Sequence, residues 1–290
     1  MIIVSGAAGK LGRRVVEILI EGGAAGRVRA LSRSLEKLAD LAARGVEARR
    51  ADFDDPATLP TALEGGEVLL IVSTDNIVEP GARVRQHAAA IEAARAAGVR
   101  RVVYTSSPKM PVAIERDHAE TERLLRESGL TWTALRNTLY ADFLVEAGAI
   151  NPGGLVGNAG DGKVAHVTRD DCAAAAAAVL LDPAPHANRA YEITGPAALS
   201  RPEIGALLAE ILGRPVPVVD LDDATYRAGV IAAGVPAVLA EVVVEFGQAI
   251  RGGHLAHAST AVADLTGRPA TPLRAHFEAT RPALLAALGG

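Results

Sequence analysis

The fold is decided by the first twelve residues, Met1-Ile-Ile-Val-Ser-Gly-Ala-Ala-Gly-Lys-Leu-Gly12. The apolar run at residues 1–4 predicts a buried parallel strand, and from Leu11 onward apolar residues recur at helical spacing. A strand, a glycine turn and a helix in this order can bind a dinucleotide pyrophosphate, because the helix N-terminus offers free N–H groups and missing side chains let the phosphates approach. An ordinary tight turn is the alternative. The residues expected at the cofactor are Gly6, Ala7, Ala8, Gly9, Lys10, Leu11 and Gly12.

Length and composition indicate a globular protein. The chain has 290 residues, of which 49 % are hydrophobic, and a formal net charge of −4. This charge argues against a nucleic acid or an anionic membrane as partner. Cys172 is the only cysteine, so no internal disulfide can form, and a reducing compartment fits. With no signal-peptide pattern and no apolar run long enough to span a bilayer, we expect a cytoplasmic monomer or homodimer.

Strand and helix patterns alternate through the first half of the chain. This alternation predicts an α/β fold, a Rossmann-like doubly wound parallel sheet with helices on both faces. In the helix expected at residues 80–97, Val84, Ala88 and Ile91 are expected to point inward. Further strands are expected at residues 27–31, 46–50, 68–72, 102–105 and 131–135, and helices at residues 34–43, 56–63 and 115–128.

The regular alternation ends before residue 150. Glycine-rich residues 152–162 predict a loop-rich wall or lid. An alanine-rich helix at residues 170–181 and a strand at residues 189–194 follow, and residues 200–252 are mostly helical in pattern, with one strand at residues 216–219.

These patterns predict two domains. We expect a dinucleotide-binding domain at residues 1–150, completed by a helix and a strand from residues 165–195. Residues 151–290 form a smaller, mostly helical domain that covers the substrate cleft.

The end of the second strand indicates which cofactor is bound. An acidic residue usually binds the ribose 2′-hydroxyl there, but this chain has Ser32-Arg33-Ser34, with Lys37 one turn further on. A guanidinium suits a 2′-phosphate, to which it can donate two hydrogen bonds. Arg33 therefore predicts NADP(H) rather than NAD(H), the alternative being a solvated arginine in a loop. Asp52 and Phe53 are expected beside the adenine, unless Asp52 caps the following turn.

One catalytic pair is missing from the sequence. Short-chain dehydrogenases use as proton donor a Tyr with a Lys four residues later, and no Tyr and Lys of this chain have that spacing. In the helix expected at residues 115–128, His118 takes the Lys position and Ile114 the Tyr position. A strong side-chain acid for ketone reduction is therefore not expected.

The ordered set of motifs resembles the NmrA-like atypical short-chain dehydrogenases, and within them the bacterial NAD(P)H:quinone oxidoreductases and triphenylmethane reductases. The matching pieces run nearly from end to end of the chain. They are Ser5 to Gly12, Ser32-Arg33, Ala51-Asp52-Phe53, Tyr104-Thr-Ser106, His118-Ala-Glu-Thr-Glu122, Leu135-Arg-Asn137 with Tyr140, Gly160-Asp-Gly-Lys163, Thr168-Arg-Asp-Asp171, Tyr191-Glu-Ile-Thr-Gly195 and Thr266-Gly-Arg-Pro269.

The resemblance implies an NADPH site, a pocket between the sheet and the C-terminal helices, and hydride transfer to quinone-like acceptors. His118, Asn137 and Tyr140 are expected near the nicotinamide or the substrate, the alternative for His118 being a helix-surface or ribose-contacting histidine. Residues 107–113 are shorter than their usual counterpart and are expected to border the pocket. Further cofactor contacts are expected from Ser73, Thr74, Thr105, Ser106 and Asn137.

The missing acid agrees with such an acceptor. A quinone yields a phenolate of pKa about 10, which solvent can protonate, so the reaction needs positioning more than a tuned acid. We expect an NADPH-dependent reductase of a quinone or similar conjugated acceptor, with no metal site. The alternatives are a reductase of another conjugated substrate, such as a dye cation or an enone, and an NADP(H)-binding redox sensor that regulates a protein partner.

Overall fold

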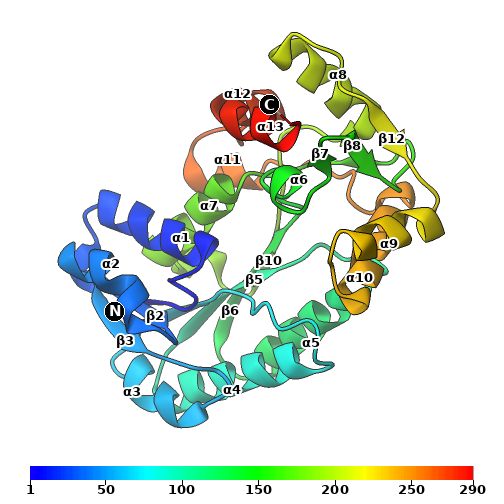
Figure 1. Ribbon diagram of the computed structural model, residues 1–290. Coiled ribbons are helices and arrows are strands. Elements are labelled where there is room, and N and C mark those ends of the chain that lie inside the picture. Colours follow the sequence, from blue (N-terminus) through cyan, green and yellow to red (C-terminus); the bar gives the residue numbers. More distant parts are fainter. Residues whose placement is uncertain (290) are drawn as a thin grey trace.

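The computed structural model, which describes residues 1–289, has a seven-stranded parallel sheet at its centre (Figure 1). The strands lie in the order β10-β6-β5-β4-β1-β2-β3, and each pairs in parallel with its neighbours. The predicted doubly wound sheet is therefore confirmed, and its order reverses between β1 and β4, where such sheets bind ligands. The strands are β1 (Ile2–Val4), β2 (Val28–Ser32), β3 (Glu47–Arg50), β4 (Val68–Ile71), β5 (Arg101–Ser106), β6 (Thr131–Asn137) and β10 (Arg189–Ile193).

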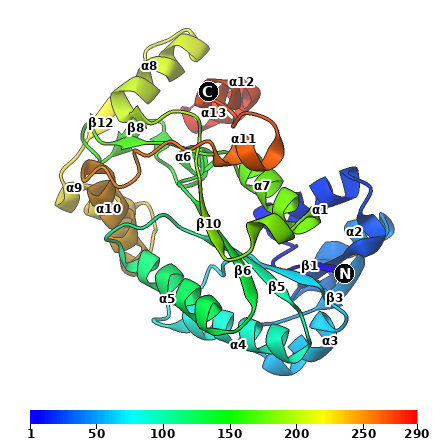
Figure 2. The ribbon, with the colours of Figure 1, turned by 180° about the vertical axis from the view of Figure 1, so that it is seen from behind.

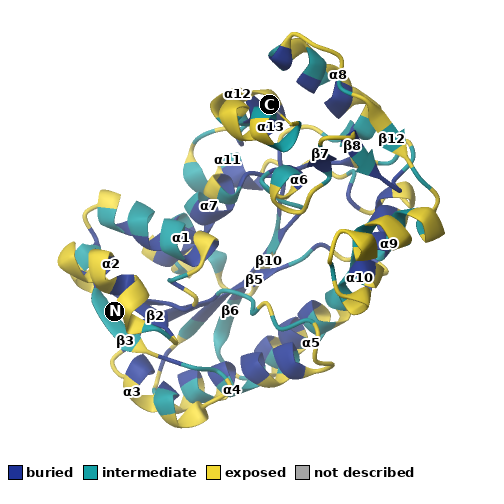
Figure 3. Ribbon diagram, viewed as in Figure 1, coloured by how far each residue is buried: buried dark blue, intermediate teal, exposed yellow. Residues whose placement is uncertain are grey.

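Helices cover both faces of this sheet (Figure 2). In β1, Ile2 and Val4 pack into the apolar cluster on one face and Ile3 into the cluster on the other, because successive strand residues point to opposite sides. Burial is concentrated in the strands between these two layers (Figure 3). One face carries α1 (Lys10–Glu21), α2 (Ala39–Ala43), α7 (Arg169–Leu181) and α11 (Ala261–Thr266), and the other α3 (Leu59–Leu63), α4 (Ala82–Ala96) and α5 (Ala113–Glu127).

Two of the expected helices begin as 3-10 turns. The segment expected at residues 34–43 is a 3-10 turn at Leu35–Leu38 followed by α2, and that at residues 56–63 is a 3-10 turn at Pro56–Thr58 followed by α3. In the second case Pro60 has no N–H to bond to the carbonyl four residues earlier, so a regular α-helix cannot run through both prolines. Two more 3-10 turns lie at Ala25–Arg27 and Ala184–His186.

The prediction of a loop at residues 152–162 is wrong in part. A short sheet of order β12-β8-β7 forms there from β7 (Ile150–Asn151), β8 (Gly154–Gly157) and β12 (Val218–Asp220). A Cβ at Gly154, where φ is +107°, would lie 2.2 Å from the carbonyl oxygen of Pro217. Glycine at this position thus permits a close approach of two chain segments as well as a turn.

The remaining C-terminal elements are mostly helical, as expected. Ser200 caps α8 (Arg201–Leu212) in a capping box with Glu203, and α10 (Ala237–Arg251) lies beside α5. No helix in residues 1–289 combines the length and apolarity that crossing a membrane requires. The other elements are β9 (Lys163–Val164), β11 (Leu199–Ser200), α6 (Phe143–Glu146), α9 (Asp223–Ala232), α12 (Leu273–Ala279) and α13 (Arg281–Ala287). The division into two domains stays a prediction.

Candidate active site

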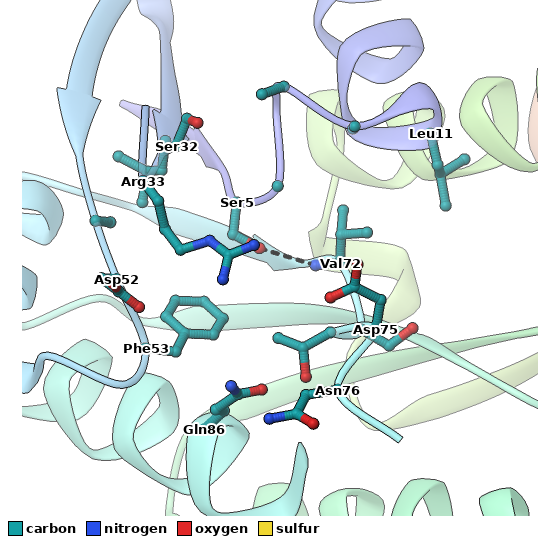
Figure 4. A pocket seen from close by; sticks show the side chains of 18 of the residues that line it. Ser5, Leu11, Ser32, Arg33, Asp52, Phe53, Val72, Asp75, Asn76 and Gln86 are labelled. Atoms are coloured by element: carbon teal, nitrogen blue, oxygen red, sulfur yellow. Dashed lines mark hydrogen bonds between the residues drawn. The ribbon is translucent and has the colours of Figure 1, made fainter. Parts of the chain in front are cut away.

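A cavity of about 620 Å³ opens at the carboxyl ends of β1, β2, β3 and β4 (Figure 4). Its volume is within the range of ligand and cofactor pockets. It includes four polar residues that sequence reasoning missed, Asp54, Asp75, Asn76 and Gln86. Of the residues expected at the cofactor, those that line it are Gly6, Ala8, Gly9, Lys10, Leu11, Gly12, Arg33, Asp52, Phe53, Ser73 and Thr74.

The glycine turn forms the phosphate side of this cavity. The N–H of Gly9 donates to the carbonyl oxygen of Gly6 over 2.9 Å, and Gly6 has a φ of +60°. A Cβ at Gly12 would lie 2.4 Å from that same carbonyl oxygen, so α1 packs against the turn at a distance that only glycine allows. Gly9 precedes α1 without a side-chain cap, which leaves N–H groups free for a phosphate. Ala7 lies beneath the turn, fully buried, and is not among the lining residues.

Arg33 extends into the cavity from the end of β2 (Figure 4). Arg33 is exposed, and its guanidinium forms no hydrogen bond or ion pair within residues 1–289, whereas the guanidinium of Arg29, in β2, is buried and bonded to Glu47. The donors of Arg33 are therefore available to a ligand, and a 2′-phosphate matches their geometry. Phe53 and Asp52 line the same cavity from the segment after β3.

A second pocket of about 110 Å³ adjoins the first, and Ser73 lines both. Among the described residues that line it, none is Lys, Arg, Asp or Glu. Of residues 107–113, which were expected to border the pocket, Ser107, Pro108 and Met110 line it. Phe143 of α6 and Phe246 of the distant α10 were missed. The lining residues are Ser73, Thr105, Ser106, Ser107, Pro108, Met110, Ile114, His118, Asn137, Thr138, Leu139, Tyr140, Phe143 and Phe246.

Asn137 and Tyr140 form a hydrogen-bonded pair in the wall of the second pocket. The Asn137 Nδ2 donates to the Tyr140 hydroxyl over 3.1 Å, while the Asn137 Oδ1 is buried without a partner among residues 1–289. Burial raises the pKa of Tyr140, so its hydroxyl keeps its proton. The Tyr140 hydroxyl, held by Asn137, is thus a hydrogen-bond donor in the wall of the second pocket.

His118 lines the second pocket, but both its ring nitrogens are bonded within the protein. Its Nε2 lies 3.2 Å from Nη1 of Arg83, and its Nδ1 lies 2.7 Å from the Tyr104 hydroxyl. Since a guanidinium only donates, Nε2 accepts and Nδ1 carries the proton. Burial lowers the pKa of His118 to about 3, with the Arg83 charge adding to the effect. The imidazole is therefore neutral near pH 7 and has no free N–H to give to a ligand; it is not a helix-surface residue.

Thr105 and Ser106 lie in the second pocket rather than in the larger cavity where the cofactor turn is. The Thr105 Oγ1 accepts from the backbone N–H of Ser73 over 2.8 Å, and the Ser106 Oγ donates to Glu122 over 2.8 Å. Their hydroxyl groups thus hold neighbouring segments in place at the junction of the two pockets.

Comparison with known proteins assigns the family. Residues 6–183 match the model of an NAD(P)H-binding family. The chain belongs to this NAD(P)H-binding, NmrA-like family. Quinone oxidoreductase 2 of Escherichia coli (strain K12) is 37 % identical over 94 % of this chain and 96 % of that protein. The NAD(P)H azoreductase of Xenophilus azovorans is 35 % identical over 93 % of this chain and 94 % of that protein.

Solved structures agree with this assignment. The NADPH-dependent quinone oxidoreductase of Escherichia coli complexed with NADPH matches with a TM-score of 0.90 and 36 % identity, over 97 % of this chain and 99 % of that one. The Citrobacter sp. triphenylmethane reductase complexed with NADP(H) matches with a TM-score of 0.90 and 32 % identity, over 98 % and 100 %. The protein is thus an NAD(P)H-dependent oxidoreductase of the quinone reductase-like type, and its homologues bind the cofactor that Arg33 predicts.

Proposed function

We propose that this protein transfers hydride from NADPH to a quinone or a similar neutral, conjugated acceptor. The observation that carries the proposal is the second pocket, which is small, uncharged and partly aromatic and adjoins the cofactor cavity at Ser73. The larger cavity fits the cofactor, because the glycine turn leaves room for a pyrophosphate and Arg33 is available to a 2′-phosphate. A flat acceptor in the second pocket then lies next to the cofactor site.

The side chains of the pocket suit such an acceptor. NADPH, when bound, supplies the hydride. The Tyr140 hydroxyl donates a hydrogen bond to the acceptor oxygen on which negative charge develops, and Asn137 holds that hydroxyl in place. Phe143 and Phe246 give the pocket an aromatic wall against which a flat ring can pack. The product oxygen, with a pKa of about 10, takes its proton from solvent.

None of the described residues that line the second pocket is Lys, Arg, Asp or Glu, which favours a neutral acceptor over a dye cation. The azoreductase and the triphenylmethane reductase act on other acceptors, as their names state. A cation in an apolar pocket loses its hydration, and no Asp or Glu is among the described lining residues to compensate for that loss. Quinones with one or two rings are neutral, so burying them in this pocket does not strip a charge of its hydration.

The proposal is tested by following NADPH oxidation with and without a panel of acceptors. The panel holds neutral benzoquinones and naphthoquinones, an azo dye and a cationic triphenylmethane dye. We expect the neutral quinones to be reduced with a kcat/KM at least about tenfold above that of the cationic dye, a difference of about 1.4 kcal/mol. Higher activity with the cationic dye would contradict the proposed acceptor. No oxidation with any acceptor, together with tight binding selective for the oxidised cofactor, would favour the redox sensor.

A further inference from the structure

A buried arginine lies between the two cavities and lines neither of them. Arg83, in the first turn of α4, is 4 % exposed and forms no ion pair with a carboxylate within residues 1–289. Burial lowers its pKa. Burying a guanidinium without a carboxylate partner costs free energy. The hydrogen bonds that Arg83 makes to neighbouring segments must therefore account for its position.

On one side Arg83 holds the wall of the cofactor cavity. Its Nε donates to the carbonyl oxygen of Thr74 over 2.9 Å. His87, one turn further along α4, accepts from the backbone N–H of the same Thr74 over 3.1 Å. Residues four apart share a helix face, so one face of α4 holds both backbone groups of Thr74. This inward face is polar at Arg83 and His87, whereas Val84 and Ala88, which were expected to point inward, are only half-buried.

Residues 72–74 follow β4, and hydrogen bonds to side chains hold their backbone in place. The N–H of Val72 donates to the Ser5 Oγ over 2.9 Å, and the N–H of Ser73 donates to the Thr105 Oγ1 over 2.8 Å. Val72, Ser73 and Thr74 all line the cofactor cavity, and Ser73 also lines the acceptor pocket. This segment is therefore the boundary at which cofactor and acceptor meet.

On the other side Arg83 holds the wall of the acceptor pocket. Its Nη1 donates to Nε2 of His118 over 3.2 Å, and Nδ1 of the same ring donates to the Tyr104 hydroxyl over 2.7 Å. His118 lines the acceptor pocket from α5. One guanidinium thus bonds to a residue in the wall of each cavity.

We propose that Arg83 is a positioning residue for hydride transfer, which holds Thr74 and His118 together at the boundary between the cofactor cavity and the acceptor pocket. The inference rests on the proposed function. Hydride transfer requires the donor and acceptor atoms at near contact, and a misplacement of about 1 Å can lower a rate by about 100-fold. Arg83 touches neither ligand pocket and acts through the residues that do.

The test compares Arg83→Met and Arg83→Lys with the wild type in single-turnover reduction of a quinone, alongside the dissociation constant for NADPH. Arg83→Met removes both hydrogen bonds, and we expect a fall in the single-turnover rate of about 100-fold with unchanged NADPH affinity. Arg83→Lys keeps a donor for one of the two partners and should recover part of the rate. The matched control is Arg95→Met, an exposed arginine of the same helix bonded to Glu92, which should leave both quantities unchanged.

A second readout separates positioning from a general loss of structure. The charged and titratable groups near His118 are Arg83 and His87 from α4, Tyr104 from β5 and Asp117 from its own helix. Without Arg83 the Nε2 is free and a neighbouring positive charge is gone, so the imidazole of His118 should titrate at a higher pH in Arg83→Met. NMR titration of the ring measures this, with Arg83→Met/His118→Asn to assign the signal.

A wild-type single-turnover rate in Arg83→Met overturns the inference. So does a loss of rate matched by an equal loss of NADPH affinity, since Arg83 would then be a binding residue. Should Arg83→Met not fold, Arg83→Lys decides by the same comparison of rate and affinity. If the wild type reduces no quinone, the proposed function fails, and a His118 titration that is the same with and without Arg83 then overturns the positioning role as well.

Discussion

The side-chain amide of Asn137 donates a hydrogen bond to the hydroxyl of Tyr140 over 3.1 Å, at the carboxyl end of β6. Both residues line the same pocket. The segment between them is held in place, because the N–H of Thr138 donates to the carbonyl oxygen of Ile193 in β10 and Tyr140 bridges to Val167. The chain has no Tyr and Lys four residues apart, and we propose that this pair supplies a neutral hydrogen-bond donor in place of that proton donor.

Tyr140→Phe should lower kcat/KM for quinones while NADPH affinity is unchanged. A hydrogen bond to a charged oxygen contributes about 1.5–3 kcal/mol, so the expected loss is about tenfold to 100-fold. Steady-state kinetics and a cofactor titration measure both quantities. Tyr191→Phe is the control, because the Tyr191 hydroxyl bonds to His186 and lines neither pocket. An unchanged kcat/KM in Tyr140→Phe would exclude the hydroxyl from the reaction.

Gly9→Val should abolish NADPH binding and leave the fold largely intact. A Cβ at Gly9 meets only the Gly6 carbonyl oxygen, at 3.3 Å, so the added methyl groups occupy the space of the pyrophosphate rather than that of the protein. In Gly12→Ala the Cβ would lie 2.4 Å from the same oxygen, so both affinity and melting temperature should fall. Fluorescence titration and thermal unfolding separate the two cases, with Gly26→Ala, where nothing lies within 4 Å, as control. Wild-type affinity in Gly9→Val would rule out this turn as the phosphate site.

Arg33 should decide the preference for NADPH over NADH. One or two charge-assisted hydrogen bonds at about 1.5–3 kcal/mol each correspond to a preference of at least about tenfold. Arg33→Ala should weaken NADPH much more than NADH, with some phosphate affinity retained through Lys37, and Arg33→Asp should shift the preference toward NADH. Dissociation constants for both cofactors, measured for the wild type and each variant, test whether Arg33 sets this preference. Equal losses for both cofactors, or none for either, would show that Arg33 does not bind the 2′-phosphate.

The protein should lose stability as the pH falls from about 6.5 toward 4.5, before most carboxylates are protonated. Burial lowers the pKa of His87, His118 and His166 to about 3 in the folded protein. Below the unfolded pKa of about 6.5 the unfolded chain therefore binds protons that the folded protein does not, which costs up to about 1.4 kcal/mol per pH unit for each histidine. Urea unfolding across this pH range measures the slope.

His166→Asn should make the dependence of the unfolding free energy on pH shallower, because one of the three buried histidines is removed. His166 lines neither cavity, so the variant leaves the walls of both unchanged. A free energy of unfolding that stays constant over the same range would show that these histidines are protonated equally in both states.

The fold up to β6 could be predicted from the sequence because its signals are local. A buried parallel strand is a continuous apolar run, and the helix that follows it has its own periodicity, so residues 1–135 could be interpreted segment by segment. Of the short sheet of β7, β8 and β12, only β12 overlaps a strand that the sequence predicted, at residues 216–219. β7 and β8 could not be predicted, since β8 pairs with residues far along the chain and its glycines have the same composition as a loop.

In the candidate active site, too, some residues could be predicted from the sequence and others only from the tertiary structure. The glycine turn and Arg33 belong to contiguous motifs with a defined geometry, so the sequence alone predicted that they line one cavity, and it predicts a preference for NADP(H) there. Arg83 and Arg85 stand two residues apart in one helix, and nothing in their spacing tells them apart. Only the packing of α4 against α5 and the sheet buries Arg83 between Thr74 and His118 and leaves Arg85 in solvent. A polar side chain can be buried only where neighbouring elements provide hydrogen-bond partners for it, and only the tertiary structure decides where that is.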